Sequence, residues 1–175
     1  MRTAVVVGNP KPASRTAKAA EAIAENLTGA PVDVAVDVIG LGPGLLGWGD
    51  PAVKEAVESV ASAELVVFAS PTFKATYTGL LKLFLDQFAT GDGLKGVTAL
   101  PLMLGAGPAH ALAPDLLLKP VLVELGATCP SPGLYLNDKR AEELGAEAPE
   151  VTAYLDTWRP VLLATVRAWA GTARG

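Results

Sequence analysis

The stretch TAVVVGNPKPASRTAKAA, residues 3–20, joins an apolar run to an alanine-rich segment through a loop with two prolines. Residues 3–7 show no alternation of apolar and polar side chains, which is typical of a strand buried on both faces. Residues 14–27 then repeat small apolar side chains at helical spacing. The stretch predicts a strand, a loop and a helix in succession, with one helix face formed by Ala17, Ala20, Ala24 and Leu27.

The same succession of strand and helix continues along the chain. Residues 32–38 (VDVAVDV) alternate regularly, which indicates a strand with one solvated face near an edge of the sheet. Alternating strands and helices are typical of a parallel sheet with helices on both faces, and we expect one domain over residues 1–175. Further strands are expected at 64–70 and 97–107, and further helices at 50–62, 78–88, 114–126 and 151–170.

Capping and breaking residues mark two of these helices. Asp50 is a good N-cap, and Pro51 fits the first helical position after it. Pro120 lies inside the predicted helix 114–126 and is expected to bend it or tighten its first turns. The glycine-rich segment 40–50 and the charged segment 138–150 are expected to be a surface loop and a solvated excursion.

Composition excludes several classes of protein. Half of the 175 residues are hydrophobic and 18% are charged, which argues for a well-filled core, and the net charge of −4 is not that of a nucleic-acid binder. No run of about 18 apolar residues predicts a membrane span, and the N-terminal apolar segment is too short for a signal peptide. The one cysteine, Cys129, cannot form an internal disulfide, so we expect a reducing, cytoplasmic setting and a half-buried apolar role for that residue.

The loop after the first strand has the composition of a phosphate cradle. It lies where ligands bind in open α/β sheets, at the carboxyl end of a strand and the N-terminus of a helix. Ser14 and Thr16 offer hydroxyl groups, Lys11 and Arg15 offer charge, and Gly8 lets the backbone turn. Ser14 also qualifies as an ordinary N-cap, so the loop alone leaves a site without ligand open.

Two further loops follow strands at the same expected edge. In SPTFKATYTG (70–79), Thr72, Phe73, Lys74 and Ala75 offer backbone groups suited to the edge of a flat heterocycle. In LGAGPAH (104–110), Gly105 and Gly107 would let a flat group approach the backbone. A Walker A loop and a complete G-x-G-x-x-G fingerprint are both absent from the sequence. A phosphate cradle beside two ring-binding loops favours a mononucleotide site, and FMN fits it best.

Together, the segments GNPKPASRT, PTFKATYTGLLKLFLDQF and GAGPAHALAPDLLLKPVLVELGA resemble the NADPH-dependent FMN reductase family, over about residues 3–128. The nearest branch is the flavin reductases of two-component monooxygenases. The resemblance implies a flavodoxin-like, doubly wound sheet of five parallel strands in the order 2-1-3-4-5, with FMN and NADPH or NADH as cofactors. It implies hydride transfer from the nicotinamide to the flavin, with no catalytic side chain, and a monooxygenase as a candidate partner.

The resemblance also implies a role for particular residues. Lys11 stands where the family usually has an arginine, so it keeps the charge without the bidentate fork. His110, the one histidine, could contact the flavin or the nicotinamide nucleotide, or could simply bond to backbone. The phosphate is assigned to Asn9, Lys11, Ser14, Arg15 and Thr16, the ring to Pro71, Thr72, Phe73, Lys74 and Ala75, and the border of the ring to Gly105, Ala106 and Gly107.

Other functions remain open on the sequence. FMN could be a prosthetic group that passes electrons to a quinone, an azo dye or a metal oxyanion. The chain could also be a flavodoxin-like electron carrier that never meets NAD(P)H, or a binding protein that kept the fold and lost the chemistry. The segment GLLKLFLDQF (79–88) is apolar on nearly all sides, which predicts a homodimer or homotetramer built partly on this helix. Burial of the helix under the C-terminal helix is the alternative.

Overall fold

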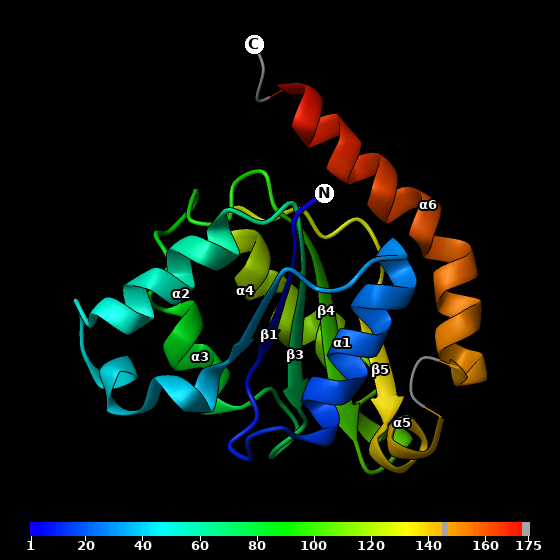
Figure 1. Cartoon of the computed structure of the whole chain (residues 1–175). Coiled ribbons are helices and arrows are strands. Elements are labelled where there is room, and N and C mark those ends of the chain that lie inside the picture. Colours follow the sequence, from blue (N-terminus) through cyan, green and yellow to red (C-terminus); the bar gives the residue numbers. More distant parts are fainter. Residues whose placement is uncertain (145–146, 173–175) are drawn as a thin grey trace.

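Five parallel strands form one sheet in the order β2-β1-β3-β4-β5 (Figure 1). The computed structural model describes residues 1–144 and 147–172. This sheet confirms the expected five-stranded, flavodoxin-like order. The strands are β1 (Thr3–Val7), β2 (Val34–Asp37), β3 (Leu65–Pro71), β4 (Thr98–Gly105) and β5 (Leu134–Asn137).

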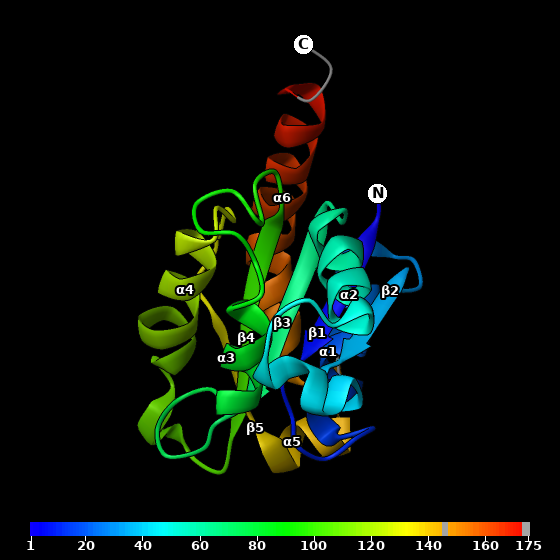
Figure 2. The same cartoon turned by 90° about the vertical axis from the view of Figure 1, so that its left-hand side faces the viewer.

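Helices cover both faces of the sheet, as Figures 1 and 2 show from two directions. One face carries α1 (Arg15–Thr28), α5 (Asp138–Leu144) and α6 (Pro149–Thr172). The other carries the 3₁₀ segment η1 (Val38–Leu46), α2 (Pro51–Ala61), α3 (Gly79–Leu85), the π-helical turn η3 (Pro114–Leu118) and α4 (Lys119–Glu124), with the short turn η2 (Pro108–His110) after β4.

Successive residues of each strand supply the two cores in turn. Ala4 and Val6 of β1 face the side of α2 and α3, whereas Val5 and Val7 face α1. All four are at most 3% exposed, which explains the unbroken apolar run in the sequence. β2 differs because Ala35 is exposed, so the predicted edge strand with a solvated face is confirmed.

Capping predictions are confirmed at two helix starts. The Ser14 hydroxyl accepts a hydrogen bond from the Ala17 N–H group at 3.2 Å. The Asp50 carboxylate accepts from the N–H groups of Ala52 and Val53, with Pro51 in the first turn. These oxygens satisfy amides that the helices themselves leave without a partner.

The predicted helix 114–126 is divided into a π turn and an α-helix. Pro120 explains the division, because it has no N–H group and its ring would clash with the carbonyl of Leu116 in an α-helical turn. The Lys119 N–H group reaches back to the Pro114 carbonyl instead, one residue further than in an α-helix. The expected surface loop 40–50 also differs, since most of it belongs to η1.

The fifth strand and the helix after it were not located by the sequence analysis. β5 has only four residues and follows the segment PSPG (130–133). The charged segment 138–150, expected as a solvated excursion, begins with α5 and runs into the start of α6; its residues 145–146 lie outside the described part of the chain.

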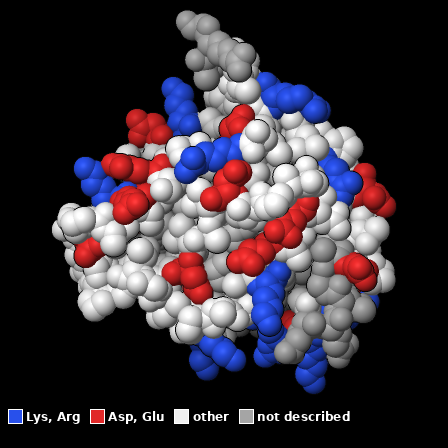
Figure 3. All heavy atoms as spheres, viewed as in Figure 1, with Lys and Arg blue, Asp and Glu red and all other residues white. Residues whose placement is uncertain are grey.

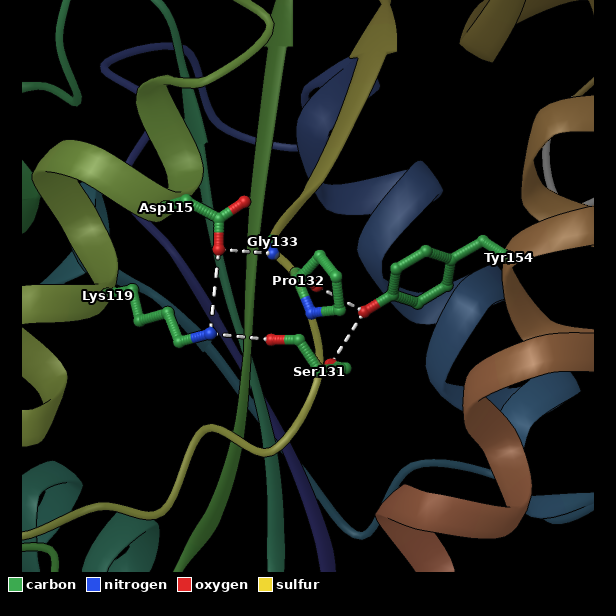
Figure 4. A network of polar contacts seen from close by, with 6 residues as sticks. All are labelled: Asp115, Lys119, Ser131, Pro132, Gly133 and Tyr154. Carbon is green, nitrogen blue, oxygen red and sulfur yellow. Dashed lines mark hydrogen bonds and ion pairs between the residues drawn. The ribbon is translucent and has the colours of Figure 1, made fainter.

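A polar network holds the entry to β5 between the two helical layers (Figure 4). On one side Lys119, itself 3.5 Å from the Asp115 carboxylate, donates to the Ser131 carbonyl at 2.8 Å. On the other side the Tyr154 hydroxyl, from α6, donates to the Pro132 carbonyl at 2.6 Å and shares a hydrogen bond with the Ser131 hydroxyl at 2.7 Å. Burial raises the pKa of Tyr154 to about 12, so its hydroxyl stays protonated well into the alkaline range.

The apolar helix α3 is buried largely by its own chain. Leu81, Phe84 and Leu85 are at most 1% exposed, and they pack in the same core as residues of η1 and α4. α6 lies on the other face of the sheet, so the alternative of burial under the C-terminal helix is wrong. Within the described residues, no helix is both long and apolar enough to cross a membrane.

β1 meets α3 at an unusually close contact. A Cβ atom at Gly8 would lie 2.3 Å from the Cβ of Leu81, so only glycine fits where the strand ends. The Gly8 N–H group donates to the Ala69 carbonyl at 2.8 Å, and the Thr78 hydroxyl donates to the Gly8 carbonyl at 2.6 Å. These contacts fix the point at which the first loop leaves the sheet.

We expect Gly8→Ala to lower the free energy of unfolding by about 2 kcal/mol, because the added methyl overpacks the β1–α3 contact. Urea unfolding followed by circular dichroism measures the change. Gly47→Ala is the matched control, since Gly47 has an extended backbone (φ −146°) and no atom lies within 4 Å of the point that its new methyl group would occupy. Equal stability of the two variants would contradict the contact.

Candidate functional site

The loop between β1 and α1 is held by its own side chains. Asn9 accepts a hydrogen bond from the Lys11 N–H group at 2.9 Å and donates to the Thr16 hydroxyl at 3.0 Å. Ser14 and Thr16 are buried, at 3% and 2% exposure, so their hydroxyl groups lie at the base of the loop. The loop therefore leads to the N-terminus of a 14-residue helix, where free amides and the helix dipole favour an anion.

Three loops meet at the carboxyl edge of the sheet around one cavity of about 660 Å³. The structure brings ten of the predicted residues together there: Asn9, Lys11, Ser14, Arg15, Thr16, Pro71, Thr72, Phe73, Gly105 and Ala106. Sequence reasoning missed five further lining residues: Pro10, Ala13, Lys18, Leu104 and Asp138. The i+4 spacing from Ser14 could have indicated Lys18, because residues four apart share a helix face.

Positive charge collects at one end of this cavity. Lys11, Arg15 and Lys18 line it, with Asp138 as its acidic member. In Figure 3, lysine and arginine side chains gather along the lower margin, which is the carboxyl edge of the sheet in Figure 1. The whole chain has a net charge of −4, so the cationic site stands out against the rest of the molecule. Such a site favours an anionic ligand.

The loop after β3 makes a strained tight turn. Phe73 and Thr76 exchange two backbone hydrogen bonds, of 2.9 and 3.3 Å, and the two residues between them, Lys74 and Ala75, have φ angles of 52° and 70°. Two successive positive φ angles are the pattern of a type I′ turn, which normally takes Asn-Gly or another glycine pair. Lysine and alanine here are strained, a condition that clusters at functional sites.

Thr72 lies between this turn and the cavity. Its N–H group donates to the Leu104 carbonyl at 2.6 Å, which ties the loop to β4. Its hydroxyl oxygen is buried and has no hydrogen-bond partner among the described residues. A buried hydroxyl without a partner is rare in a folded protein, and this one belongs to a residue that lines the cavity.

Side chains of β5 hold the glycine loop after β4. The Tyr135 hydroxyl donates to the Gly107 carbonyl at 2.7 Å, and the Asn137 amide donates to the Ala106 carbonyl at 3.0 Å. A Cβ at Gly105 would lie 2.0 Å from the Tyr135 hydroxyl oxygen, so Tyr135 already fills the space that this glycine leaves. Sequence reasoning missed both β5 residues, because it placed no strand there.

Two predicted residues line a neighbouring cavity instead. His110 and Ala75 belong to a second, more apolar hollow of about 400 Å³ with Leu112 and Leu116. His110 is exposed and lies in η2. Lys74 is at the exposed tip of the strained turn.

No thiol or metal chemistry is indicated in the part of the chain that the structure describes. Burial raises the pKa of the Cys129 thiol to about 11, so it is protonated at neutral pH and a poor nucleophile. Within residues 1–144 and 147–172, no group of His, Cys, Asp and Glu side chains could hold a metal ion. The predicted role of Cys129 as a partly buried apolar residue agrees with this environment.

The sheet order and the three loops at its carboxyl edge define a flavodoxin-like α/β protein with a cavity where open α/β sheets bind their ligands. The family model of NADPH-dependent FMN reductases matches residues 1–142, and the chain belongs to this family.

Individual relatives agree with that assignment. An FMN reductase (NADPH) of Escherichia coli strain K12 is 33% identical over 161 residues, covering 90% of this chain and 83% of that protein. A Pseudomonas putida protein named NADH-dependent FMN reductase SfnF is 32% identical over 79 residues, 45% of this chain and 42% of that protein. The apo crystal structure of the NADH:FMN oxidoreductase EmoB has a TM-score of 0.79 at 31% identity, covering 95% of this chain and 89% of that one.

We expect Ala75→Gly to raise the free energy of unfolding by about 1 kcal/mol, because glycine adopts the positive φ of the strained turn without the Cβ clash. Thermal unfolding measures the change. Ala153→Gly is the control: Ala153 is an exposed residue inside α6, where glycine should lower stability by about 1 kcal/mol. A loss of stability at both positions would contradict the strain.

Proposed function

We propose that this chain, as one domain over residues 1–175, transfers a hydride from NADPH or NADH to FMN. The observation that carries the proposal is the single cavity that joins a cationic loop at a helix N-terminus to two backbone-rich loops. Its volume of about 660 Å³ lies in the ordinary range of small-molecule sites. Family membership makes the chain an oxidoreductase that acts on flavin.

The lining residues fit the two ends of FMN. In the proposal Asn9, Lys11, Ser14, Arg15 and Thr16 hold the phosphate, because this end combines cations, hydroxyls and free helix amides. The flat ring lies against Pro71, Thr72 and Phe73 on one side and against Gly105 and Ala106 on the other, the residues of the two predicted ring loops that line this cavity. The unpartnered Thr72 hydroxyl supports this placement, since a rotation of its side chain toward the cavity would let a polar ring edge satisfy it.

Bound FMN supplies the hydride-accepting chemistry, and the protein supplies binding and orientation. Thr72 and the glycine loop hold the ring edge, and Phe73, 50% exposed beside the cavity, shields it from water. Stacking of the nicotinamide against the ring is a matter of proximity, which needs no side-chain nucleophile or base. We therefore assign no catalytic side chain, and give His110 only a contact with the flavin or the nicotinamide nucleotide.

We further propose that FMN is an exchangeable substrate and that reduced FMN is delivered to a monooxygenase. Relatives named as FMN reductases support this reading over a tightly held flavin. The setting we propose is the cytoplasm, because a chain with one cysteine forms no internal disulfide. The second candidate keeps FMN bound and passes electrons to a quinone, an azo dye or a metal oxyanion.

Oxidation of NADPH and of NADH by the purified protein, with FMN varied from none to excess, tests the function. We expect a nearly colourless protein whose rate saturates with added FMN. A yellow protein that ignores added FMN until a quinone or dye is supplied would favour the second candidate. Flavin binding without any oxidation of either nucleotide would contradict hydride transfer and favour an electron carrier.

We also propose homo-oligomerisation, which residues 79–88 predicted, but we place the interface on a different surface. Because α3 is mostly covered by its own chain, the exposed apolar side chains of the neighbouring segment are the better interface. Leu112 and Leu116 are each 66% exposed and Val123 is 53% exposed. Leu112 and Leu116 share the second cavity with Ala75, so the interface we propose borders the strained turn after β3.

We expect the double substitution Leu112→Glu and Leu116→Glu to reduce the sedimentation coefficient to that of a monomer, because charge at the centre of an apolar interface is strongly disfavoured. Leu46→Glu is the control, since Leu46 is 77% exposed but lies in η1. An unchanged oligomer in the double variant would refute the interface.

A further inference from the structure

We propose that Asp37, at the end of β2, is a positioning residue that holds the phosphate loop (residues 9–14) in the shape that receives the phosphate of FMN. The proposal rests on the proposed function. Asp37 acts from outside the loop, through the backbone of Ala13, rather than by contact with the ligand.

The contact joins two segments that are distant in sequence. The Asp37 carboxylate accepts a hydrogen bond from the Ala13 N–H group at 3.1 Å, across 24 positions of the chain. The parallel register makes it reachable, because Asp37 pairs with Val7, just before the loop begins. Ala13 lines the cavity and directly precedes Ser14, the N-cap of α1.

Asp37 bonds to Ala13 instead of capping the helix that it precedes. It is the N-cap residue of η1, where an aspartate normally accepts from the first amides of its own helix. Its side chain makes no such capping bond in the structure. Its other carboxylate oxygen is buried with no partner among the described residues, which costs stability. The position of this carboxylate is therefore not the one that would best stabilise the fold. Its one described hydrogen bond is to the phosphate loop.

Ala13 needs this support. Its φ angle is 47°, a left-handed conformation that disfavours any residue with a Cβ. Rotation of Ala13 into the ordinary region would move Lys11 relative to Arg15 and would strain the hydrogen bond between the Asn9 amide and the Thr16 hydroxyl, which spans the loop. The Asp37 hydrogen bond opposes that rotation, so it keeps the two halves of the phosphate cradle together.

Equilibrium binding of FMN and of riboflavin, measured by quenching of flavin fluorescence, tests the proposal. Riboflavin has the same ring and no phosphate. We expect Asp37→Ala to weaken FMN binding about tenfold, the effect of losing one hydrogen bond to a charged acceptor. Riboflavin binding should be unchanged, and with NADPH the loss should appear in KM for FMN rather than in kcat.

Two substitutions separate positioning from general damage. Ala13→Gly, which adopts the same φ without strain, should restore FMN binding when combined with Asp37→Ala. Asp37→Asn keeps an acceptor oxygen and should bind FMN nearly as well as the wild type. Asp33→Ala is the matched control: Asp33 accepts from the Thr3 N–H group at 2.7 Å at the opposite edge of the sheet. It should lower stability and leave FMN binding unchanged.

Equal loss of FMN and riboflavin binding in Asp37→Ala, an unchanged affinity for FMN, or failure of Ala13→Gly to rescue it would each overturn the proposal. If Asp37→Ala does not fold, the double variant with Ala13→Gly decides: FMN binding near the wild-type value supports the proposal, and a tenfold loss overturns it. Wild-type protein that binds no FMN would instead refute the proposed function, so the two failures are distinguishable.

Discussion

Because the strands of this sheet are all parallel, the chain leaves every one of them at the same edge of the sheet. The register aligns Val7 with Asp37 on one side and with Ala69 on the other, and aligns Gly105 with Asn137 at the far side of the sheet. The loops that follow must therefore meet, whatever their sequences. The glycine at position 8 lets the first loop turn closely over α3. The cavity, the cationic side chains that line it and the meeting of the loops after β1, β3 and β4 all depend on that alignment.

Local sequence patterns predicted the parts of the structure that local forces determine. β1, β3 and β4 are long apolar runs because both faces of the sheet are buried, and the helix caps at Ser14 and Asp50 are recognisable from a few residues. β5 was not located, because its four residues carry little pattern of their own. It is held in place by Lys119 and Tyr154, which reach it from distant elements.

The same distinction applies to the site. Residues that lie next to one another in the phosphate loop could be found from the sequence, since strand, loop and helix follow directly. Tyr135, Asn137 and Asp37 could not, because each acts on a loop that belongs to another part of the chain. Their hydrogen bonds go to backbone groups, so no feature of the receiving sequence indicates them. The loop sequences indicate where the site lies, but hydrogen bonds from the neighbouring strands β2 and β5 determine its shape.

The dependence of the glycine loop on β5 has a consequence for synthesis of the protein. Tyr135 and Asn137 hold the carbonyl groups of Gly107 and Ala106, yet they leave the ribosome long after the phosphate loop. Among the described residues, the loop after β1 is held by hydrogen bonds to Asp37, Ser14, Ala69 and Thr78, all of which precede β5 in the chain. The side of the cavity formed by the glycine loop is completed last, when β5 joins the edge of the sheet. A nascent chain that ends after β4 would carry all three loop motifs and still lack a finished cavity.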